Sequence, residues 1–254
     1  MRTPEEAARR VFGQRAATYT SSASHTDAEV LATVVRMSAP EPHWSVLDVA
    51  TGAGHTAFAL SPHAGSITGI DLTPEMLGEA RKLAEARSIT NVRLCLADIH
   101  HLPFADGSFH LITCRRAAHH FSSIGLALKE MKRALRAGGR LVIDDRSVPE
   151  DDFVDQVMNQ LDRYHDESHV RQYRPSEWRR MLEDLGLFVE EMAPYTRHRP
   201  LSALTAGVSQ ENVQRIHDLL QGLDRAEREA LNVGEVHGET HLNHWFVTVS
   251  ARKG

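Results

Sequence analysis

Three aspartates and two glycines have the types and spacing of a site for a small polar ligand. Asp48, Asp71 and Asp98 each lie at or just beyond the end of a short apolar run of the kind that forms a strand. Gly52 and Gly54 follow the first run, and glycine accepts the positive φ angles that let a ligand approach the backbone. Ligands of open α/β sheets bind outside the carboxyl ends of the strands. The pattern therefore predicts a ligand site at that edge.

Residues 46–57 fit two kinds of adenosine-containing cofactor. They read as an apolar strand, a Gly-x-Gly turn and the start of a helix, whose first N–H groups are free to bind a ligand. With Ala57 in third place the segment matches the dinucleotide fingerprint, and Asp71 suits a ribose in either case. Asp48 favours a cofactor that contains a methionine moiety over a dinucleotide. A carboxylate on the strand repels a pyrophosphate and attracts the ammonium group of the methionine moiety.

A second motif makes the combination specific. From Leu96 the chain reads Leu-Ala-Asp-Ile-His-His-Leu-Pro-Phe-Ala-Asp-Gly-Ser-Phe, so an acid follows the third expected strand. Over residues 44–145 the sequence resembles the class I S-adenosylmethionine (SAM)-dependent methyltransferases, and among them the ubiquinone/menaquinone C-methyltransferases and small-molecule relatives. The resemblance implies SAM as cofactor, S-adenosylhomocysteine as product, and C- or O-methylation of a small molecule, such as a quinone-like compound or a secondary metabolite.

The resemblance also assigns residues to the parts of SAM. It implies that the methionine end is surrounded by Asp48, Ala50, Gly52, Gly54 and Arg115, with Tyr19 near the carboxylate. It implies that the adenosine end is held by Asp71 on the ribose hydroxyls, Leu72 and Met76 against the adenosine, Asp98 on the adenine amino group, and Ile99 beside the ring.

A histidine pair after the fourth expected strand is the candidate for catalysis. The quinone enzymes lack this pair, and a sub-branch of uncharacterised methyltransferases matches better, through residues 166–171 and 176–178. Imidazole titrates near neutral pH, so we expect His120, or otherwise His119, to take a proton from the acceptor. Adjacent residues of a helix point about 100° apart, so at most one should face the cleft. The alternative is a structural histidine at a helix start.

Other polar residues are weaker candidates for contact with the acceptor. Asp144 and Asp145 end the fifth expected strand on opposite sides, so one is expected to cap the next helix and the other, Asp144, to face the substrate. A further group falls where the fold places insertions, and each of its members is alternatively a solvated surface residue: His165, His169, Arg171 and Tyr173.

Alternating strands and helices position these residues. Strands are expected at 45–50, 66–71, 92–97, 109–114, 139–145, 187–193 and 244–251, and helices at 4–19, 26–38, 55–61, 74–88, 122–136, 151–166, 176–185 and, as two helices, within 202–231. This alternation implies right-handed βαβ units on a parallel sheet. The resemblance implies an α/β, Rossmann-like three-layer αβα fold, with a seven-stranded, mostly parallel sheet whose last strand is antiparallel.

We expect a helical cap over residues 1–42 and a SAM-binding domain over residues 43–254. Helical insertions are expected at about 150–175 and 197–236. The amphipathic stretch 211–231 suits a lid packed on the sheet edge, or otherwise the face of a homodimer.

Bulk composition limits the partners. The 254 residues carry a net charge of −5, without the basic field of a nucleic-acid-binding protein. The sequence has no apolar stretch long enough to span a bilayer and no signal peptide, and Cys95 and Cys114 read as reduced core residues, so we expect a cytoplasmic protein. The spacing of His237, His241 and His244 does not predict a metal site.

Two other functions share this pattern. A non-catalytic SAM-binding protein would use the same cofactor residues without an open acceptor site. An NAD(P)-binding oxidoreductase would use the same sheet, but it has no role for Asp48 or Asp98.

Overall fold

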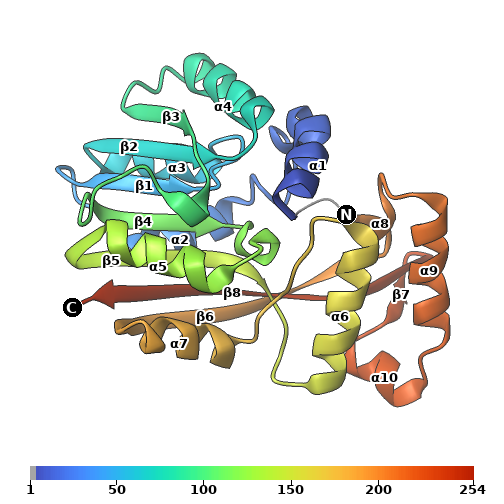
Figure 1. The fold of residues 1–254 in the computed structure, drawn as a ribbon. Helices are drawn as coiled ribbons and strands as arrows, with labels where there is room; N and C mark the ends of the chain where they lie inside the picture. Colours follow the sequence, from blue (N-terminus) through green and yellow to red (C-terminus); the bar gives the residue numbers. More distant parts are fainter. Residues whose placement is uncertain (1–3) are drawn as a thin grey trace.

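The computed structural model describes residues 4–254 as a mixed sheet with helices on both faces and a second lobe at one end (Figure 1). The strands are β1 (Ser45–Val49), β2 (Ser66–Asp71), β3 (Val92–Leu96), β4 (Phe109–Arg115), β5 (Leu135–Ser147), β6 (Leu187–Pro200), β7 (Gly234–Val236) and β8 (Glu239–Lys253). The helices are α1 (Pro4–Tyr19), α2 (Ala28–Ser38), α3 (His55–Leu60), α4 (Pro74–Ala86), α5 (Ile124–Ala134), α6 (Asp152–His165), α7 (Pro175–Asp184), α8 (Ser202–Thr205), α9 (Gln210–Gln221) and α10 (Arg225–Ala230).

The strand order confirms the expected Rossmann-like fold. The sheet runs β3-β2-β1-β4-β5-β8-β6, with parallel pairing from β3 to β5. The last strand, β8, is antiparallel to both of its neighbours, β5 and β6. Seven strands were expected, and the short β7 pairs with β8 as an eighth. The chain order reverses between β1 and β4, which is where this class of sheet opens a ligand crevice.

Alternation along the strands builds the two outer layers. Leu47 and Ile112 pack with α5 and α7 on one face, whereas their chain neighbours Val46 and Leu111 pack with α2, α3 and α4 on the other. All four side chains are fully buried. Burial of each such side chain stabilises the fold by about 1.5–3 kcal/mol. Two cores, one on each face, therefore hold the carboxyl ends of the strands in fixed positions.

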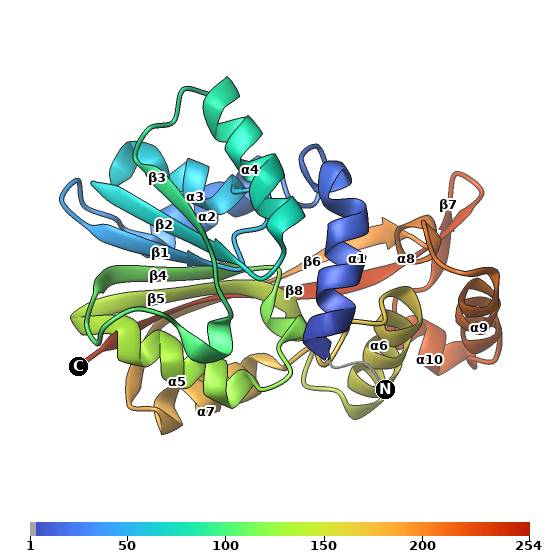
Figure 2. The same cartoon turned by 45° about the horizontal axis from the view of Figure 1, so that its top comes forward.

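The second lobe is built on a two-stranded ribbon that continues out of the sheet. β5 pairs with β8 as far as Ser147 and Trp245, but β6 and β8 remain paired as far as Pro200 and His241. Helices α6, α8 and α9 pack on this extension around a third apolar cluster (Figure 2). The strands expected at 187–193 and 244–251 are therefore too short, and part of the expected insertion at 197–236 is strand. The polar residues 196–199 hide the alternation that marks a strand.

The N-terminal helices do not act as a pair. α1 lies at the carboxyl ends of the strands, between the sheet and the lobe, and contacts α4 (Figure 2). α2 packs on α3, β5 and β8 as part of an outer layer. It begins at Asp27, whose side chain accepts from the N–H groups of Glu29 and Val30. Only α1 and the segment before α2 therefore border the ligand site.

The amphipathic face of α9 lies inside the lobe. Ile216 and Leu220 are buried in the third cluster, where α9 contacts α6 rather than the sheet edge. This face is therefore covered within one chain, and a homodimer would need another surface.

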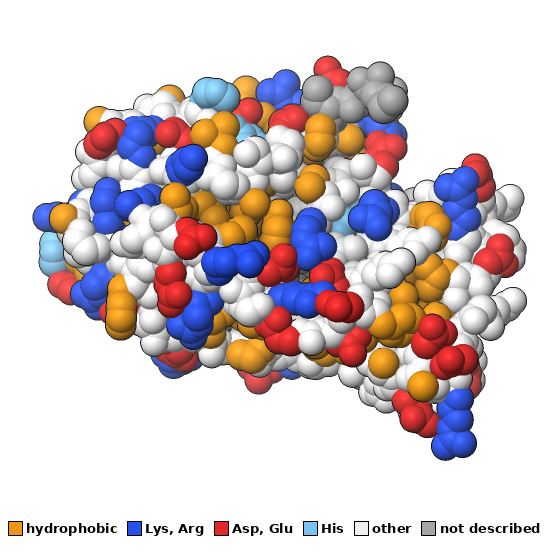
Figure 3. Space-filling model, turned by 60° about the horizontal axis from the view of Figure 1, so that its bottom comes forward, with side chains coloured by type: hydrophobic (Ala, Val, Ile, Leu, Met, Phe, Trp, Pro, Cys, Tyr) orange, Lys and Arg blue, Asp and Glu red, His pale blue; other side chains and the backbone are white. Residues whose placement is uncertain are grey.

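The surface on the side shown in Figure 3 intermixes acidic and basic side chains rather than gathering the basic ones into one field. Among residues 4–254, no helix combines the length and apolarity required to cross a bilayer.

Candidate functional site

A cleft opens at the carboxyl ends of β1, β2, β3 and β4, and α1 borders it. Its lining includes all the predicted site residues except Gly54 and His119; those it includes are Tyr19, Asp48, Ala50, Gly52, Asp71, Leu72, Met76, Asp98, Ile99, Arg115 and His120. Residues expected from four separate strand ends therefore meet in one place.

Left-handed backbone shapes the turn between β1 and α3. Ala50, Gly52 and Gly54 have φ angles of +51°, +56° and +87°. A Cβ atom on Gly52 would lie 3.0 Å from Cε of Met76, so the turn closes against α4. Gly54 does not line the cleft as expected. It is the N-cap of α3, and a Cβ there would lie 2.4 Å from the Phe58 ring. Its role is to let the helix start.

Asp71 holds the glycine turn. Its Oδ2 accepts the Gly52 N–H at 2.8 Å and its Oδ1 accepts the Thr73 N–H at 2.9 Å. Burial raises the pKa of this carboxyl, and the backbone hydrogen bonds oppose that rise. A carboxylate accepts roughly four hydrogen bonds, so the acceptor capacity left over can serve two ribose hydroxyls.

Asp48 is buried below the turn. Its two oxygens accept from the hydroxyls of Thr51 at 2.5 Å and Thr113 at 2.7 Å. Burial raises the pKa of Asp48 above its ordinary value, although these hydroxyls and the charge of Arg115 act in the opposite direction. A cationic group in the cleft would be attracted to this carboxylate.

Asp98 borders the cleft from the loop after β3. Its Oδ1 accepts both the N–H and the ring Nδ1–H of His100, at 2.9 and 2.8 Å. Burial raises the pKa of Asp98, but these hydrogen bonds outweigh burial and leave the pKa below its ordinary value. Asp98 is therefore a charged acceptor at the edge of the cleft.

Arg115 supplies a buried donor that lacks a partner. Its Nε donates to Thr56 and its Nη2 to the His25 carbonyl, both at 2.8 Å. Its Nη1 is buried and makes no hydrogen bond within residues 4–254. Buried donors are nearly always paired in native proteins. A carboxylate such as that of the methionine moiety would satisfy this atom, so the cleft fits the predicted cofactor.

A second cavity of about 510 Å³ adjoins the cleft. This volume lies within the range of small-molecule sites. The lining of both spaces includes Phe12, Tyr19, His25, Arg116 and His120. The second cavity therefore meets the cleft along a shared wall, between the sheet and the lobe.

The two predicted catalytic histidines take different positions in a short 3-10 helix, Ala118–His120. His120 lines both spaces, whereas His119 lines only the second cavity. We expected at most one of the two histidines to face the site. This is true of the cleft, which only His120 lines, but not of the second cavity, which both histidines line. The tighter helix places the two rings with their centroids 4.0 Å apart.

Hydrogen bonds orient both rings. His120 Nδ1 lies 3.2 Å from the Ser168 carbonyl and 3.0 Å from its hydroxyl, which itself donates to Asp166. A carbonyl only accepts, so Nδ1 donates to it, and in the neutral ring Nε2 keeps its lone pair. His119 Nδ1 lies 2.5 Å from Asp145, which also accepts the His119 N–H. Burial lowers the pKa of His119 well below its ordinary value, so this ring is neutral.

The two aspartates at the end of β5 act differently from the prediction. Asp145 orients His119, and Asp144 accepts from Arg116, Tyr195 and Thr248. Neither caps α6, whose N-cap is Asp151. Neither lines the second cavity, because both side chains are fully buried behind the residues they bind.

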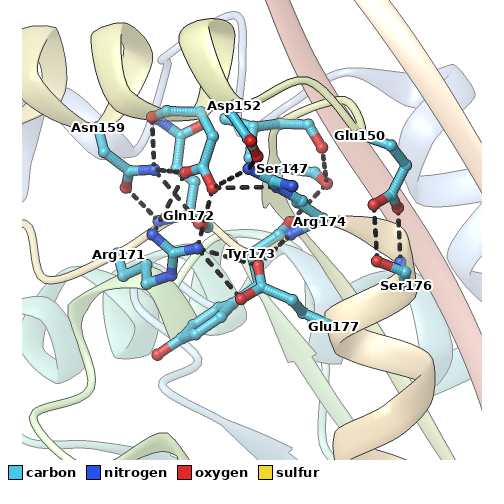
Figure 4. A network of polar contacts seen from close by, with 12 residues as sticks. Ser147, Glu150, Asp152, Asn159, Arg171, Gln172, Tyr173, Arg174, Ser176 and Glu177 are labelled. Carbon is cyan, nitrogen blue, oxygen red and sulfur yellow. Dashed lines mark hydrogen bonds and ion pairs between the residues drawn. The ribbon is translucent and has the colours of Figure 1, made fainter.

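The segment between α6 and α7 combines cavity residues with a supporting network. His165 and His169 line the second cavity, but Arg171 and Tyr173 do not. Arg171 instead forms ion pairs with Asp155 and Glu177, within a polar network that joins α6 to α7 (Figure 4). Tyr173 packs against the fully buried Trp178. The motif at 166–171 is therefore divided between the cavity and this network, whereas the motif at 176–178 is structural.

Four arginines that were not predicted as site residues line the second cavity, and one of them, Arg15, lies on α1. Arg116 lies beside Arg115 in the chain, and its φ of +55° turns the backbone after β4. Arg146 is the last residue but one of β5, and Arg199 lies on the ribbon. Arg116 had a local signal, because it lies close after the fourth expected strand, whereas Arg146 and Arg199 are brought to the cavity by the extended strands.

Comparison with known proteins gives a consistent match. A family model described as "Methyltransferase domain" matches residues 40–186, ending where β6 begins. "Uncharacterized methyltransferase YcgJ" of Bacillus subtilis is 39% identical over 171 residues, which are 67% of this chain and 68% of YcgJ. The solved structure of YcgJ has a TM-score of 0.83 at 30% identity, covering 88% of this chain and 97% of that one. A demethylmenaquinone methyltransferase of Thermus thermophilus is 42% identical over 100 residues, 39% of this chain and 45% of that enzyme.

Proposed function

The chain belongs to the methyltransferase-domain family of SAM-dependent methyltransferases, and from this premise we propose that it methylates a small molecule bound in the second cavity. The observation that carries the proposal is the wall shared by the two spaces. It is formed by residues of α1, of the loop after β4 and of the segment before α2. A reacting atom in the second cavity would meet the cofactor there, away from bulk water.

We assign the cleft to the cofactor by the residues present. Arg115 Nη1 would bind the methionine carboxylate, with Tyr19 near it, and Asp48 would attract the ammonium group from below the Gly52 turn. The adenosine end would be held by Asp71, Leu72, Met76, Asp98 and Ile99. The alternating left-handed residues of the turn let the backbone approach the ligand.

We assign proton removal to His120. As the acceptor's electron pair bonds to the methyl carbon, the bond from that carbon to the SAM sulfur breaks and sulfur keeps the pair. Where the acceptor atom carries a proton, Nε2 of His120 takes it, because the Ser168 carbonyl holds the proton of the neutral ring on Nδ1. His119, held by Asp145, is farther from the cleft and orients the acceptor instead.

Transfer of labelled methyl groups tests the proposal. The protein is incubated with methyl-tritiated SAM and pooled small molecules, and S-adenosylhomocysteine and labelled product are measured. His120→Gln should keep SAM affinity and thermal stability but lose about 10²–10⁴-fold in turnover. The matched control is His101→Gln, because His101 is exposed and lies outside both linings.

The outcomes separate the possibilities. SAM binding without transfer to any small molecule would point to a non-catalytic SAM-binding protein. A loss of stability in His120→Gln, with activity reduced only in proportion to folded protein, would make His120 structural.

A further inference from the structure

Arg199 is a cation without a partner in the second cavity. It lies on the part of β6 that extends beyond the sheet, opposite Leu242 of β8. It lines the cavity, and within residues 4–254 its guanidinium makes no hydrogen bond or ion pair. Arg199 is half-buried, and a charged group that has lost part of its water is stabilised by an anionic partner. The missing partner is therefore the first sign of what this cavity binds.

The charges around Arg199 do not compensate it. Burial lowers the pKa of Arg199, and the charges of Arg146 and Arg116 lower it further. Asp162 acts in the opposite direction, but it is already paired with Arg146, whose Nη2 lies 2.8 Å from its Oδ2. The wall of the lobe therefore carries an excess positive charge.

Three other arginines line the cavity and narrow the position of the expected anion, and Arg15 among them donates to the Gly207 carbonyl. Arg116 is engaged, because it donates to Asp144 and Tyr195 and stacks on the Phe246 ring. Arg146 is engaged at Nη2 only, and its Nε is buried without a partner. Unsatisfied guanidinium donors of Arg146 and Arg199 thus belong to one cavity. Such donors match the oxygens of a carboxylate or phosphate group.

Asp166, another acidic residue of the cavity, is linked through Ser168 to His120, the proposed base. Asp166 accepts from Ser168, which contacts His120. Burial raises the pKa of Asp166, but the nearby His120 and the bonds from Ser168 outweigh burial and leave it below its ordinary value. The cavity thus has two parts. Arg146 and Arg199 form a cationic part, and His120 and Asp166 form the other part, where His120 also lines the cleft.

We propose that the methyl acceptor is an anion whose carboxylate or phosphate group binds Arg199, beside Arg146, while its nucleophilic atom lies at His120. This inference rests on the proposed function and names the chemical class of its substrate. It disfavours a quinone ring, which offers only neutral oxygens to the two guanidinium groups and would leave their charge uncompensated.

Matched ligands test the inference. Benzoate, phenyl phosphate and benzyl alcohol share one ring and differ in charge, and each is titrated by calorimetry into protein saturated with S-adenosylhomocysteine. At least one anion should bind 10-fold or more tightly than the alcohol, and the stronger of the two identifies a carboxylate or a phosphate site. Arg199→Gln should abolish this preference, and Arg199→Lys should retain most of it.

The control is Arg225→Gln, which changes the net charge equally in the same lobe, at an exposed position outside the cavity. It should leave every affinity within twofold. Arg199→Gln should fold normally, with an equal or higher melting temperature, because it removes a repelled cation.

Two failures are distinguishable. No binding of S-adenosylhomocysteine would overturn the proposed function. Binding of S-adenosylhomocysteine without an anion preference, or with a preference that Arg199→Gln leaves intact, would overturn this inference alone.

Discussion

Asp71→Ala should weaken both the fold and cofactor binding, because Asp71 does two things at once. Its carboxylate holds the N–H groups of Gly52 and Thr73 at 2.8 and 2.9 Å. Hydrogen bonds to a charged group contribute about 1.5–3 kcal/mol each. Thr73 is buried, so the loss of its bond takes full effect, whereas the Gly52 N–H lies at the cleft, where water can replace the carboxylate.

The expected loss in the free energy of unfolding is therefore about 2–4 kcal/mol, from one full bond and part of a second. Urea denaturation measures it. Affinity for S-adenosylhomocysteine should fall by about 1.5–3 kcal/mol, or roughly 10- to 150-fold, because the ribose hydroxyls lose a charged acceptor. Calorimetry, under conditions where the variant is folded, measures this second effect separately.

Asp98→Ala is the matched control. Asp98 also borders the cleft, but its hydrogen bonds are local, to His100 two residues later, and its side chain is 37% exposed. This variant should lose affinity while its free energy of unfolding changes by less than about 1 kcal/mol. Equal stabilities of the two variants would refute the claim that Asp71 holds the turn. An unchanged affinity in Asp71→Ala would refute its place at the ribose.

Two further predictions follow from the glycines and the buried histidines. Gly54→Ala should destabilise the protein by about 1–2 kcal/mol or more, because the φ of Gly54 is +87° and the added Cβ meets the Phe58 ring. The control is Gly125→Ala in α5, which should be neutral or stabilising because nothing lies within 4 Å of the added Cβ. Equal shifts of the melting temperature in the two variants would contradict this prediction. The free energy of unfolding should also fall as the pH drops below about 6.5. Burial lowers the pKa of several histidines, most strongly those of His25, His119, His169 and His244. The unfolded chain then binds protons that the folded chain does not, at about 1.4 kcal/mol per histidine and pH unit. Asp145, whose pKa burial raises to about 6, opposes this trend only below that pH. Melting temperatures at pH 7.5, 6.5 and 5.5 check the sign, and a rise towards pH 5.5 would contradict it.

The sequence was sufficient for strands β1 to β4 and for most residues that line the cleft, because both depend on local patterns. Short apolar runs predicted these four strands to within one residue at each end, and Asp48, Asp71 and Asp98 follow from where the first three runs end. What a local pattern could not show is what else a side chain binds. Asp71 supports the backbone of the turn, and Gly54 serves the packing of Phe58.

The second cavity could not be predicted, because segments that are distant in the chain form it. Tyr19, His120 and Arg199 meet there although each is about 80 residues or more from the next in the chain. The ribbon that brings Arg199 to the cavity has polar residues on both of its faces, so its sequence resembles a loop. Arg146 was missed for a related reason: β5 continues past the apolar run by which its end was judged.

The continuous ladder of β6 and β8 has a consequence for engineering this protein. The glycine turn and the three aspartates precede residue 100, whereas Arg199 and the helices α8–α10 follow residue 186 on the ribbon. A transplant of residues 197–236 between related chains would cut only the outer end of the ladder and would leave the register from Leu187 to Thr196 intact. Under the proposed function, such a chimera would exchange part of the acceptor cavity while the residues proposed to hold SAM stay as they are.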